Sequence, residues 1–200
     1  MSVMRRRLIA MAASAAFLVG PAAPAKAQGA SVPAVTPYGA RSPTAPAEID
    51  LFAFLVGKWE GTSKVRLPNG TMADGGKVTW IGRWVLDGSA IADETHSLSP
   101  DGVPGVGVTL RRYDAQAHAW TVEFINVPGN FIRRQVNPRS GSVRRQGDTV
   151  VVEAADGDSL AREFYEVSGR DRFVYRIDLS KDHGKTWDTG SVEFTMARVE

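Results

Sequence analysis

The sequence predicts an all-β protein, a single antiparallel up-and-down β-barrel of about 8–11 strands that occupies residues 48–200. From Leu55 onward, apolar residues recur at every second position, as they do in strands with one buried face. Clusters of Gly, Asp and Asn interrupt this alternation about every 8 to 15 residues. No sustained helical period follows residue 56, so the chain lacks the crossovers that a parallel sheet needs.

Residues 1–27 have the pattern of a secretory signal peptide. Three arginines at positions 5–7 precede an apolar run over residues 8–20, and Ala25-Lys26-Ala27 offers small residues for cleavage before Gln28. The apolar run is too short for a bilayer, which takes roughly 20 residues. We therefore expect a periplasmic or secreted protein, cleaved near Ala27, with no stable membrane anchor.

The composition limits the possible partners and chemistry. The chain has 24 Lys+Arg and 22 Asp+Glu, a net charge of +2. Four of the basic residues and none of the acidic ones lie in the leader, so the remaining 20 and 22 give the mature chain a net charge of −2. This balance argues against a nucleic-acid partner. The chain has no Cys, which excludes disulfides, thiolate catalysis and zinc–thiolate sites.

Two short elements precede the predicted barrel strands. Residues 28–47 are rich in Ala, Pro, Ser and Gly and predict a flexible tether. Residues 48–55 predict one short helical turn, with Phe52 and Leu55 covering an end of the barrel.

The alternating segments predict eleven strands. Turns such as Asp87-Gly88 and Gly147-Asp148 separate them and contain residues that suit tight hairpins. So many strands have to close on themselves, because open sheet edges invite aggregation. The expected strands are 56–66, 76–86, 89–98, 105–113, 118–127, 130–137, 141–146, 149–154, 160–168, 171–179 and 187–199.

Alternation also predicts which face of each strand lines the lumen. Segment 76–86 has Trp80 and Trp84 on one face and polar residues on the other, and segments 118–127, 171–179 and 187–199 alternate in the same way. Strands with one apolar and one polar face predict an aromatic, apolar lumen.

The start of the first strand, Gly57-Lys58-Trp59, resembles the Gly-x-Trp signature of the calycin superfamily, which includes the lipocalins and fatty-acid-binding proteins. This resemblance implies a lipocalin-like barrel. It also implies that Trp59 closes one end and stacks on a cation of the last strand, where Arg198 is suitably placed.

A second resemblance, over most of residues 53–199, is to the bacterial lipocalin-like proteins of the DUF1579-like group. The matching motifs are Leu55-Val56-Gly57-Lys58-Trp59, Trp84-Val85-Leu86-Asp87-Gly88, and Tyr113-Asp114 followed by Trp120. The resemblance implies a fold and a superfamily but no settled activity.

The first strand is also similar to that of the haem-binding nitrobindins, although Ser63 stands where they have Gly. That resemblance would imply a His ligand on a late strand, and the only late His, His183, lies in a Gly-flanked turn. We therefore expect no haem and no other cofactor. The three scattered His show no metal-ligand spacing, so no metal is expected.

Residues 180–187, Ser-Lys-Asp-His-Gly-Lys-Thr-Trp, match the Asp-box pattern of sialidase propellers. A propeller needs several blades, and the chain has one copy of the motif. The resemblance therefore implies a stapled hairpin, in which Asp182 accepts backbone N–H groups and Trp187 packs beneath the loop.

Glu94 and His96 are the only candidates for catalysis, and no catalytic role is assigned to them. They share one face of segment 89–98. If that face is the lumen, they form a general-base or ligand-orienting pair; if it is the outside, they form a solvated surface. Ile91, on the alternate face, favours the outside. The mid-strand carboxylates Glu94, Glu123, Glu163 and Glu193 are expected on solvated faces.

The sequence thus predicts a barrel that binds a small, largely apolar ligand in its lumen. Arg133 or Arg134, if it points inward, could hold a ligand carboxylate. Two alternatives remain: a barrel enzyme that uses Glu94 and His96 on a small substrate, or a barrel filled by its own side chains. The expected ligand-binding residues are Trp80, Trp84, Trp120, Phe124, Asn126, Arg133 and Tyr175.

Overall fold

The computed structural model describes residues 37–98, 102–128, 133–135, 143–156 and 159–200. The expected signal peptide and the first part of the expected tether lie outside these residues. A 3-10 helix, η1 (Ala47–Leu55), precedes the strands. Within the described part of the chain the strands are β1 (Gly57–Arg66), β2 (Met72–Val85), β3 (Ala90–Leu98), β4 (Pro104–Asp114), β5 (Ala119–Pro128), β6 (Arg133–Gln135), β7 (Val143–Gln146), β8 (Thr149–Asp156), β9 (Ser159–Ser168), β10 (Arg172–Ser180) and β11 (Asp188–Arg198).

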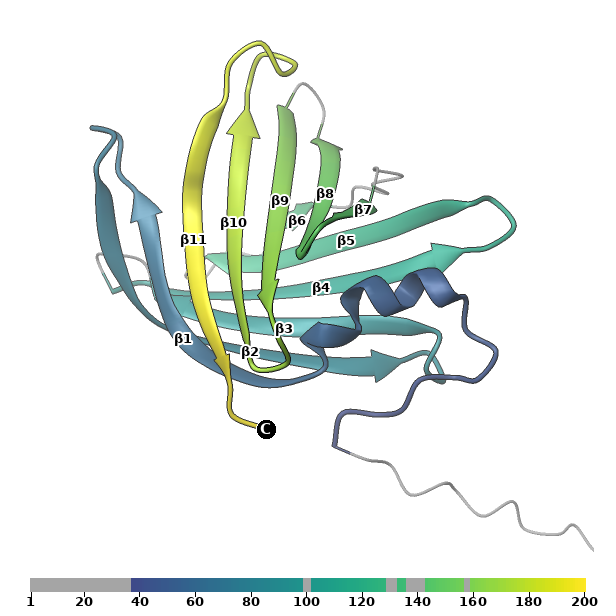
Figure 1. Ribbon diagram of the computed structural model, residues 1–200. Coiled ribbons are helices and arrows are strands. Elements are labelled where there is room, and N and C mark those ends of the chain that lie inside the picture. The colour runs from purple at the N-terminus through teal and green to yellow at the C-terminus, as the bar shows by residue number, and fades with distance from the viewer. Residues whose placement is uncertain (1–36, 99–101, 129–132, 136–142, 157–158) are drawn as a thin grey trace, which may run out of the picture. The chain divides into compact units, whose positions relative to one another are not determined.

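The strands form one antiparallel sheet that curls into a nearly closed barrel (Figure 1). Their order is β6-β5-β4-β3-β2-β1-β11-β10-β9-β8-β7, so every neighbour is also adjacent in sequence except β1 and β11. Those two strands pair from Trp59↔Arg198 to Val65↔Val192 and join the two halves of the meander. This order confirms the predicted up-and-down barrel.

The segment before η1 lies against the barrel. The N–H of Trp84 donates to the Tyr38 carbonyl at 2.8 Å, and the Ser42 N–H donates to the Gly88 carbonyl at 3.0 Å. Residues 37–47 were predicted to be tether, and this boundary is wrong. Their backbone groups pair with the end of β2 and its turn, a contact that composition alone does not reveal.

Helix η1 covers one end of the barrel, which we call the η1 end. Ile49, Phe52 and Leu55 are completely buried, and the Phe52 ring packs edge-on to Trp120 at 5.2 Å between centroids. The burial of Phe52 and Leu55 confirms that this turn covers an end of the barrel. Most of the buried apolar core lies beneath it, from Trp59 and Trp80 to Tyr165 and Phe173.

Trp59 and Arg198 lock the first and last strands together at the η1 end. The guanidinium carbon of Arg198 lies 4.1 Å from the centroid of the Trp59 ring, as the calycin resemblance implied. Arg198 also donates to the carbonyls of Phe54 and Val56 at 2.9 and 2.7 Å. Gly57 permits this approach: its φ is +126°, and a Cβ there would lie 2.2 Å from Nη1 of Arg198. The Gly-x-Trp motif is therefore a packing requirement.

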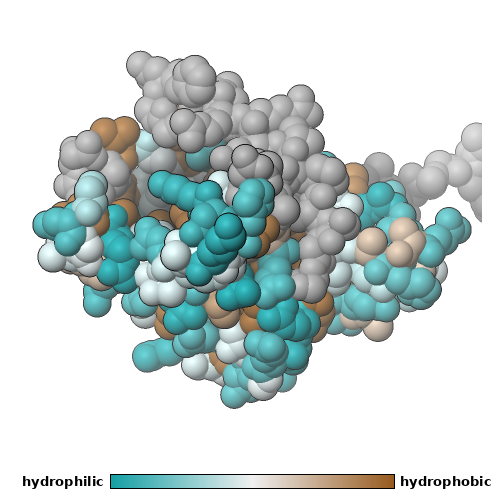
Figure 2. All heavy atoms as spheres, turned by 90° about the horizontal axis from the view of Figure 1, so that it is seen from above, coloured by the Kyte–Doolittle hydropathy of each residue, from teal (hydrophilic) through white to brown (hydrophobic). Residues whose placement is uncertain are grey.

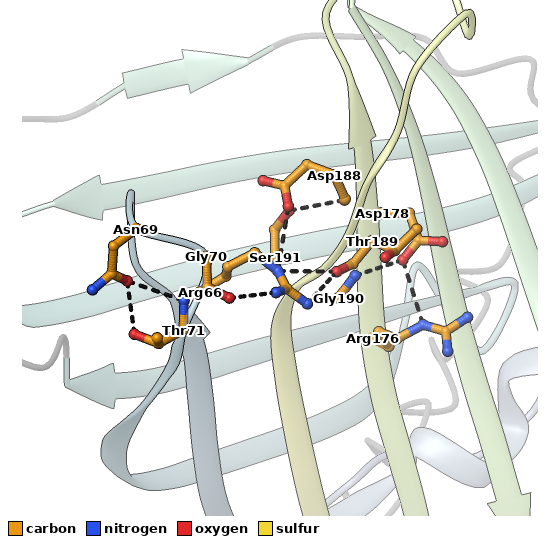
Figure 3. A network of polar contacts seen from close by, with 10 residues as sticks. All are labelled: Arg66, Asn69, Gly70, Thr71, Arg176, Asp178, Asp188, Thr189, Gly190 and Ser191. Atoms are coloured by element: carbon orange, nitrogen blue, oxygen red, sulfur yellow. Dashed lines mark hydrogen bonds and ion pairs between the residues drawn. The ribbon is translucent and has the colours of Figure 1, made fainter.

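The opposite end of the barrel, which we call the far end, is tied together on its outside. Figure 3 shows Arg66 of β1 between the carbonyls of Gly70 and Thr189, to which its guanidinium donates at 2.7 Å each. On β10, Asp178 accepts the Gly190 N–H at 2.8 Å and pairs with Arg176 at 3.4 Å. These contacts fix the β1–β2 turn and the start of β11 to the barrel wall. Seen from above, hydrophilic side chains predominate on the described surface (Figure 2).

No helix in the described residues is long and apolar enough to cross a membrane.

Candidate functional site

A cluster of aromatic rings centred on Trp80 lines one side of the lumen. Its ring packs against Phe173 and Tyr175 of β10, at 5.5 and 5.6 Å between centroids, and against Phe194 of β11 at 6.2 Å. Trp80 is buried, whereas Tyr175 and Phe194 point inward yet are only half-buried. Both residues therefore keep some accessible surface although they occupy inward-facing positions of β10 and β11.

The facing strands β3, β4 and β5 present small and polar residues to the lumen. The pairing of Trp80 with Thr95, and of Thr95 with Gly107, places these residues on the inner face. Gly107 in turn pairs with Asn126. A Cβ on Gly107 would lie 2.6 Å from the Phe124 ring, so glycine lets that ring approach β4 closely. The lumen therefore has one aromatic wall and one wall that can form hydrogen bonds.

A buried polar chain crosses the lumen near η1. Arg111 of β4 forms an ion pair with Asp93 of β3, and both side chains are at most 1% exposed. Arg111 also bonds the Tyr165 hydroxyl at 2.9 Å, and Tyr165 donates to Glu163 at 3.0 Å. Burial raises the pKa of Tyr165 well above its ordinary value, so its hydroxyl remains a donor to the Glu163 carboxylate. The guanidinium carbon of Arg111 also lies 5.0 Å from the Phe52 ring centroid.

The expected ligand-binding residues fall into two groups. Trp120 packs against Phe52 and Tyr113 beneath η1, where it fills the end of the barrel together with Trp84. Trp80, Phe124, Asn126 and Tyr175 lie farther along the inner face, where a ligand could meet them. Arg133 is opposite Asn126 in register, and Arg134 is opposite Ile125.

The structure places Glu94 and His96 on the outside. Ile91 and Asp93 occupy the inner face of β3, so the residues between and beyond them point to solvent. The two side chains pair with each other and are 46% and 49% exposed. The lumenal interpretation of this pair is therefore wrong. No group of three or more His, Asp or Glu in the described residues could hold a metal ion.

One mid-strand carboxylate was misplaced by the sequence analysis. Glu163 was expected on a solvated face, but it pairs with Val152 and Ile177 on the inner face and is 8% exposed. Alternation could have shown this, because Glu163 is two residues from Ala161 and Tyr165. Asp93 and Arg111 were missed as a pair because their contact depends on the register between β3 and β4.

The hairpin between β10 and β11 forms the stapled loop that the Asp-box pattern implied. Asp182 accepts the Thr186 N–H at 2.9 Å and its hydroxyl at 2.6 Å, and it also accepts the Ser180 hydroxyl at 2.8 Å. The Trp187 indole donates to the Gly184 carbonyl at 3.1 Å. His183 lies in this turn with φ of +58°.

Acid should weaken this hairpin. The Thr186 hydroxyl and N–H, with the Ser180 hydroxyl, lower the pKa of Asp182 to about 2. The unfolded value is about 3.9, so this carboxylate stabilises the fold fully above about pH 4 and loses its contribution as the pH falls to about 2. Denaturant midpoints of wild type and Asp182→Asn should therefore differ at pH 7 and converge at pH 2. In Thr186→Val, which lacks the donor hydroxyl, the loss should be smaller and should be complete at a higher pH than in wild type. If the denaturant midpoints of wild type and Asp182→Asn differ by the same amount at every pH down to 2, this assignment is wrong.

No protein-family model matches the chain, and no curated protein matches its sequence. Several solved structures share its fold, among them the following two. The S-type phycobiliprotein lyase CPES from Guillardia theta is 15% identical, and the alignment covers 76% of this chain and 92% of that one, with a TM-score of 0.51. Rv2717c from M. tuberculosis is 13% identical, and the alignment covers 78% and 99%, also with a TM-score of 0.51. At these identities the similarity shows the fold alone, which is an antiparallel β-barrel.

Proposed function

We propose that this protein is an exported lipocalin-like barrel that binds a small, largely apolar ligand in its lumen. The observation that carries the proposal is the aromatic wall around Trp80, where Tyr175 and Phe194 face inward but keep accessible surface. Binding sites are mostly apolar with a few directional polar groups, and the opposite wall, with Thr95 and Asn126, supplies such groups.

The family, the cellular compartment and the absence of a haem requirement are part of the same proposal. The motifs around Trp59, Trp84 and Trp120 support membership of the DUF1579-like group, and the leader over residues 1–27 supports export to the periplasm or beyond. We further propose that binding needs no haem, since His183 lies in the hairpin turn between β10 and β11. Haem titration that produces a Soret band would contradict this last point.

Binding can be tested with Nile red, a neutral apolar dye, and with fatty acids and retinol, on the chain from Gln28 onward. We expect Nile red emission to rise on mixing, and the tryptophan emission to change because Trp80 lies in the proposed site. Phe194→Ala should weaken dye binding about tenfold, because it removes apolar contact area from the aromatic wall. Ile125→Ala, on the outer face and 42% exposed in the wild type, is the matched control and should bind as wild type does.

A barrel filled by its own side chains makes the opposite prediction. Neither the dye emission nor the tryptophan emission would then change with any of these compounds, and the proposed function would be wrong.

A further inference from the structure

The inner face of β1 to β5 carries an unusual set of buried polar atoms without hydrogen-bond partners. Most buried polar groups in native proteins are paired, so each exception calls for an explanation. Among the described residues only one other such atom occurs, Nε of Arg176 on the outer face, and it lies 3.4 Å from an Asp178 carboxylate oxygen. The unpaired atoms of the inner face are Ser63 Oγ, Trp80 Nε1, Asp93 Oδ1, Arg111 Nε and Asn126 Oδ1.

Three of these atoms belong to neighbouring residues. Asp93 is paired in register with Gly82, two residues from Trp80 on the same face, and its other carboxylate oxygen holds the Arg111 guanidinium. The free oxygen of Asp93 is an acceptor, whereas Nε of Arg111 and Nε1 of Trp80 are donors. All three side chains are at least 97% buried. Together they place one unpaired acceptor and two unpaired donors on the inner face of β2, β3 and β4.

The charges of this group cancel. Asp93 and Arg111 form an ion pair, so a ligand carboxylate placed there would be repelled by Asp93, and a ligand ammonium would be repelled by Arg111. A neutral group that carries both an N–H donor and a C=O acceptor satisfies both residues without adding a charge to a dry site. The aromatic rings that pack against Trp80, those of Phe173, Tyr175 and Phe194, suit a flat apolar body.

We propose that the lumen selects an uncharged, flat, apolar ligand with an amide- or lactam-type edge. Asp93 accepts the ligand N–H, and Arg111 and Trp80 donate to its carbonyl. This inference rests on the proposed lumenal binding and narrows its ligand class, in contrast to a fatty acid held by its charged head. The polar atoms are covered in the ligand-free barrel, so the ligand has to displace covering side chains, and the hydrogen bonds it restores offset that cost.

The test compares four small bicyclic compounds as competitors of Nile red on wild-type protein. 2-Quinolinone carries both the N–H and the C=O, N-methyl-2-quinolinone only the C=O, naphthalene neither, and 2-naphthoate a negative charge. We expect 2-quinolinone to compete about tenfold better than naphthalene, with the N-methyl compound between them and 2-naphthoate weakest. If Nile red binds but 2-quinolinone competes no better than naphthalene, this inference is wrong while the proposed lumenal binding stands. If Nile red does not bind at all, both are wrong.

Two variants test whether Asp93 and Arg111 cause the preference for 2-quinolinone. Asp93→Leu combined with Arg111→Met removes the ion pair without leaving a lone buried charge, and it should lose the preference for 2-quinolinone over naphthalene. Asp93→Asn leaves the Arg111 charge uncompensated, so 2-naphthoate should become the best competitor. A double variant that still prefers 2-quinolinone about tenfold would show that these residues do not recognise the ligand edge, and it would overturn the assignment.

Discussion

Replacing Trp59 with Ala should lower the free energy of unfolding by about 3–5 kcal/mol, the range for large-to-small aromatic changes in a core. Trp59 is 1% exposed, and its ring contacts both the Arg198 guanidinium and the Phe173 ring, whose centroid is 4.8 Å away. Its indole N–H donates to the Leu55 carbonyl at 3.0 Å, which anchors the end of η1. The variant therefore loses packing, a cation–π contact and the link between helix and barrel together. Urea unfolding followed by circular dichroism measures the loss.

Trp59→Phe is the control for this prediction. It keeps an aromatic face for Arg198 but lacks the indole donor, so it should be markedly more stable than Trp59→Ala and less stable than wild type. A loss below about 1 kcal/mol for Trp59→Ala would mean that Trp59 does not hold this end of the barrel closed.

The fold was predictable because alternation is a local signal that every strand repeats. Residues such as Val78, Trp80 and Phe173 mark the inner face by their own position, and a Gly or Asp turn marks where each strand ends. The pairing of β1 with β11 was accessible only through the Gly-x-Trp resemblance, since nothing local in the first strand indicates which strand lies beside it.

The candidate site was less predictable, for two physical reasons. Asp93 and Arg111 are polar residues at inward positions, and their burial is tolerable only because each neutralises the other across β3 and β4. That contact depends on register, which a sequence does not state. The outward position of Glu94 and His96 follows from alternation along β3, because Ile91 and Asp93 occupy the inner face. The predicted boundary between tether and barrel was wrong for a related reason. Backbone hydrogen bonds hold Tyr38 and Ser42 against the barrel, and amino-acid composition does not reveal such bonds.

Breaking the Asp93–Arg111 pair should also cost about 3–5 kcal/mol, because removal of one partner leaves the other charge buried and uncompensated. Asp93→Leu leaves the Arg111 guanidinium, 1% exposed, with the Tyr165 hydroxyl as its remaining hydrogen-bond partner among the described residues. The second change, Arg111→Met, removes that stranded charge. The double variant should therefore be more stable than Asp93→Leu alone and recover most of the wild-type stability, although it contains one more substitution.

Recovery of stability in the double variant would distinguish an ion pair that the fold needs from one that is retained for another purpose. Urea unfolding of wild type, both single variants and the double variant gives the coupling energy of the pair directly. Additive losses in the double variant would mean that the two side chains do not compensate each other, contrary to the structure. Recovery would mean that hydrophobic residues can replace the pair at little cost to the fold. The pair's presence would then need an explanation other than stability, and the unpaired oxygen of Asp93 and nitrogen of Arg111 on the lumenal wall point to recognition of a ligand.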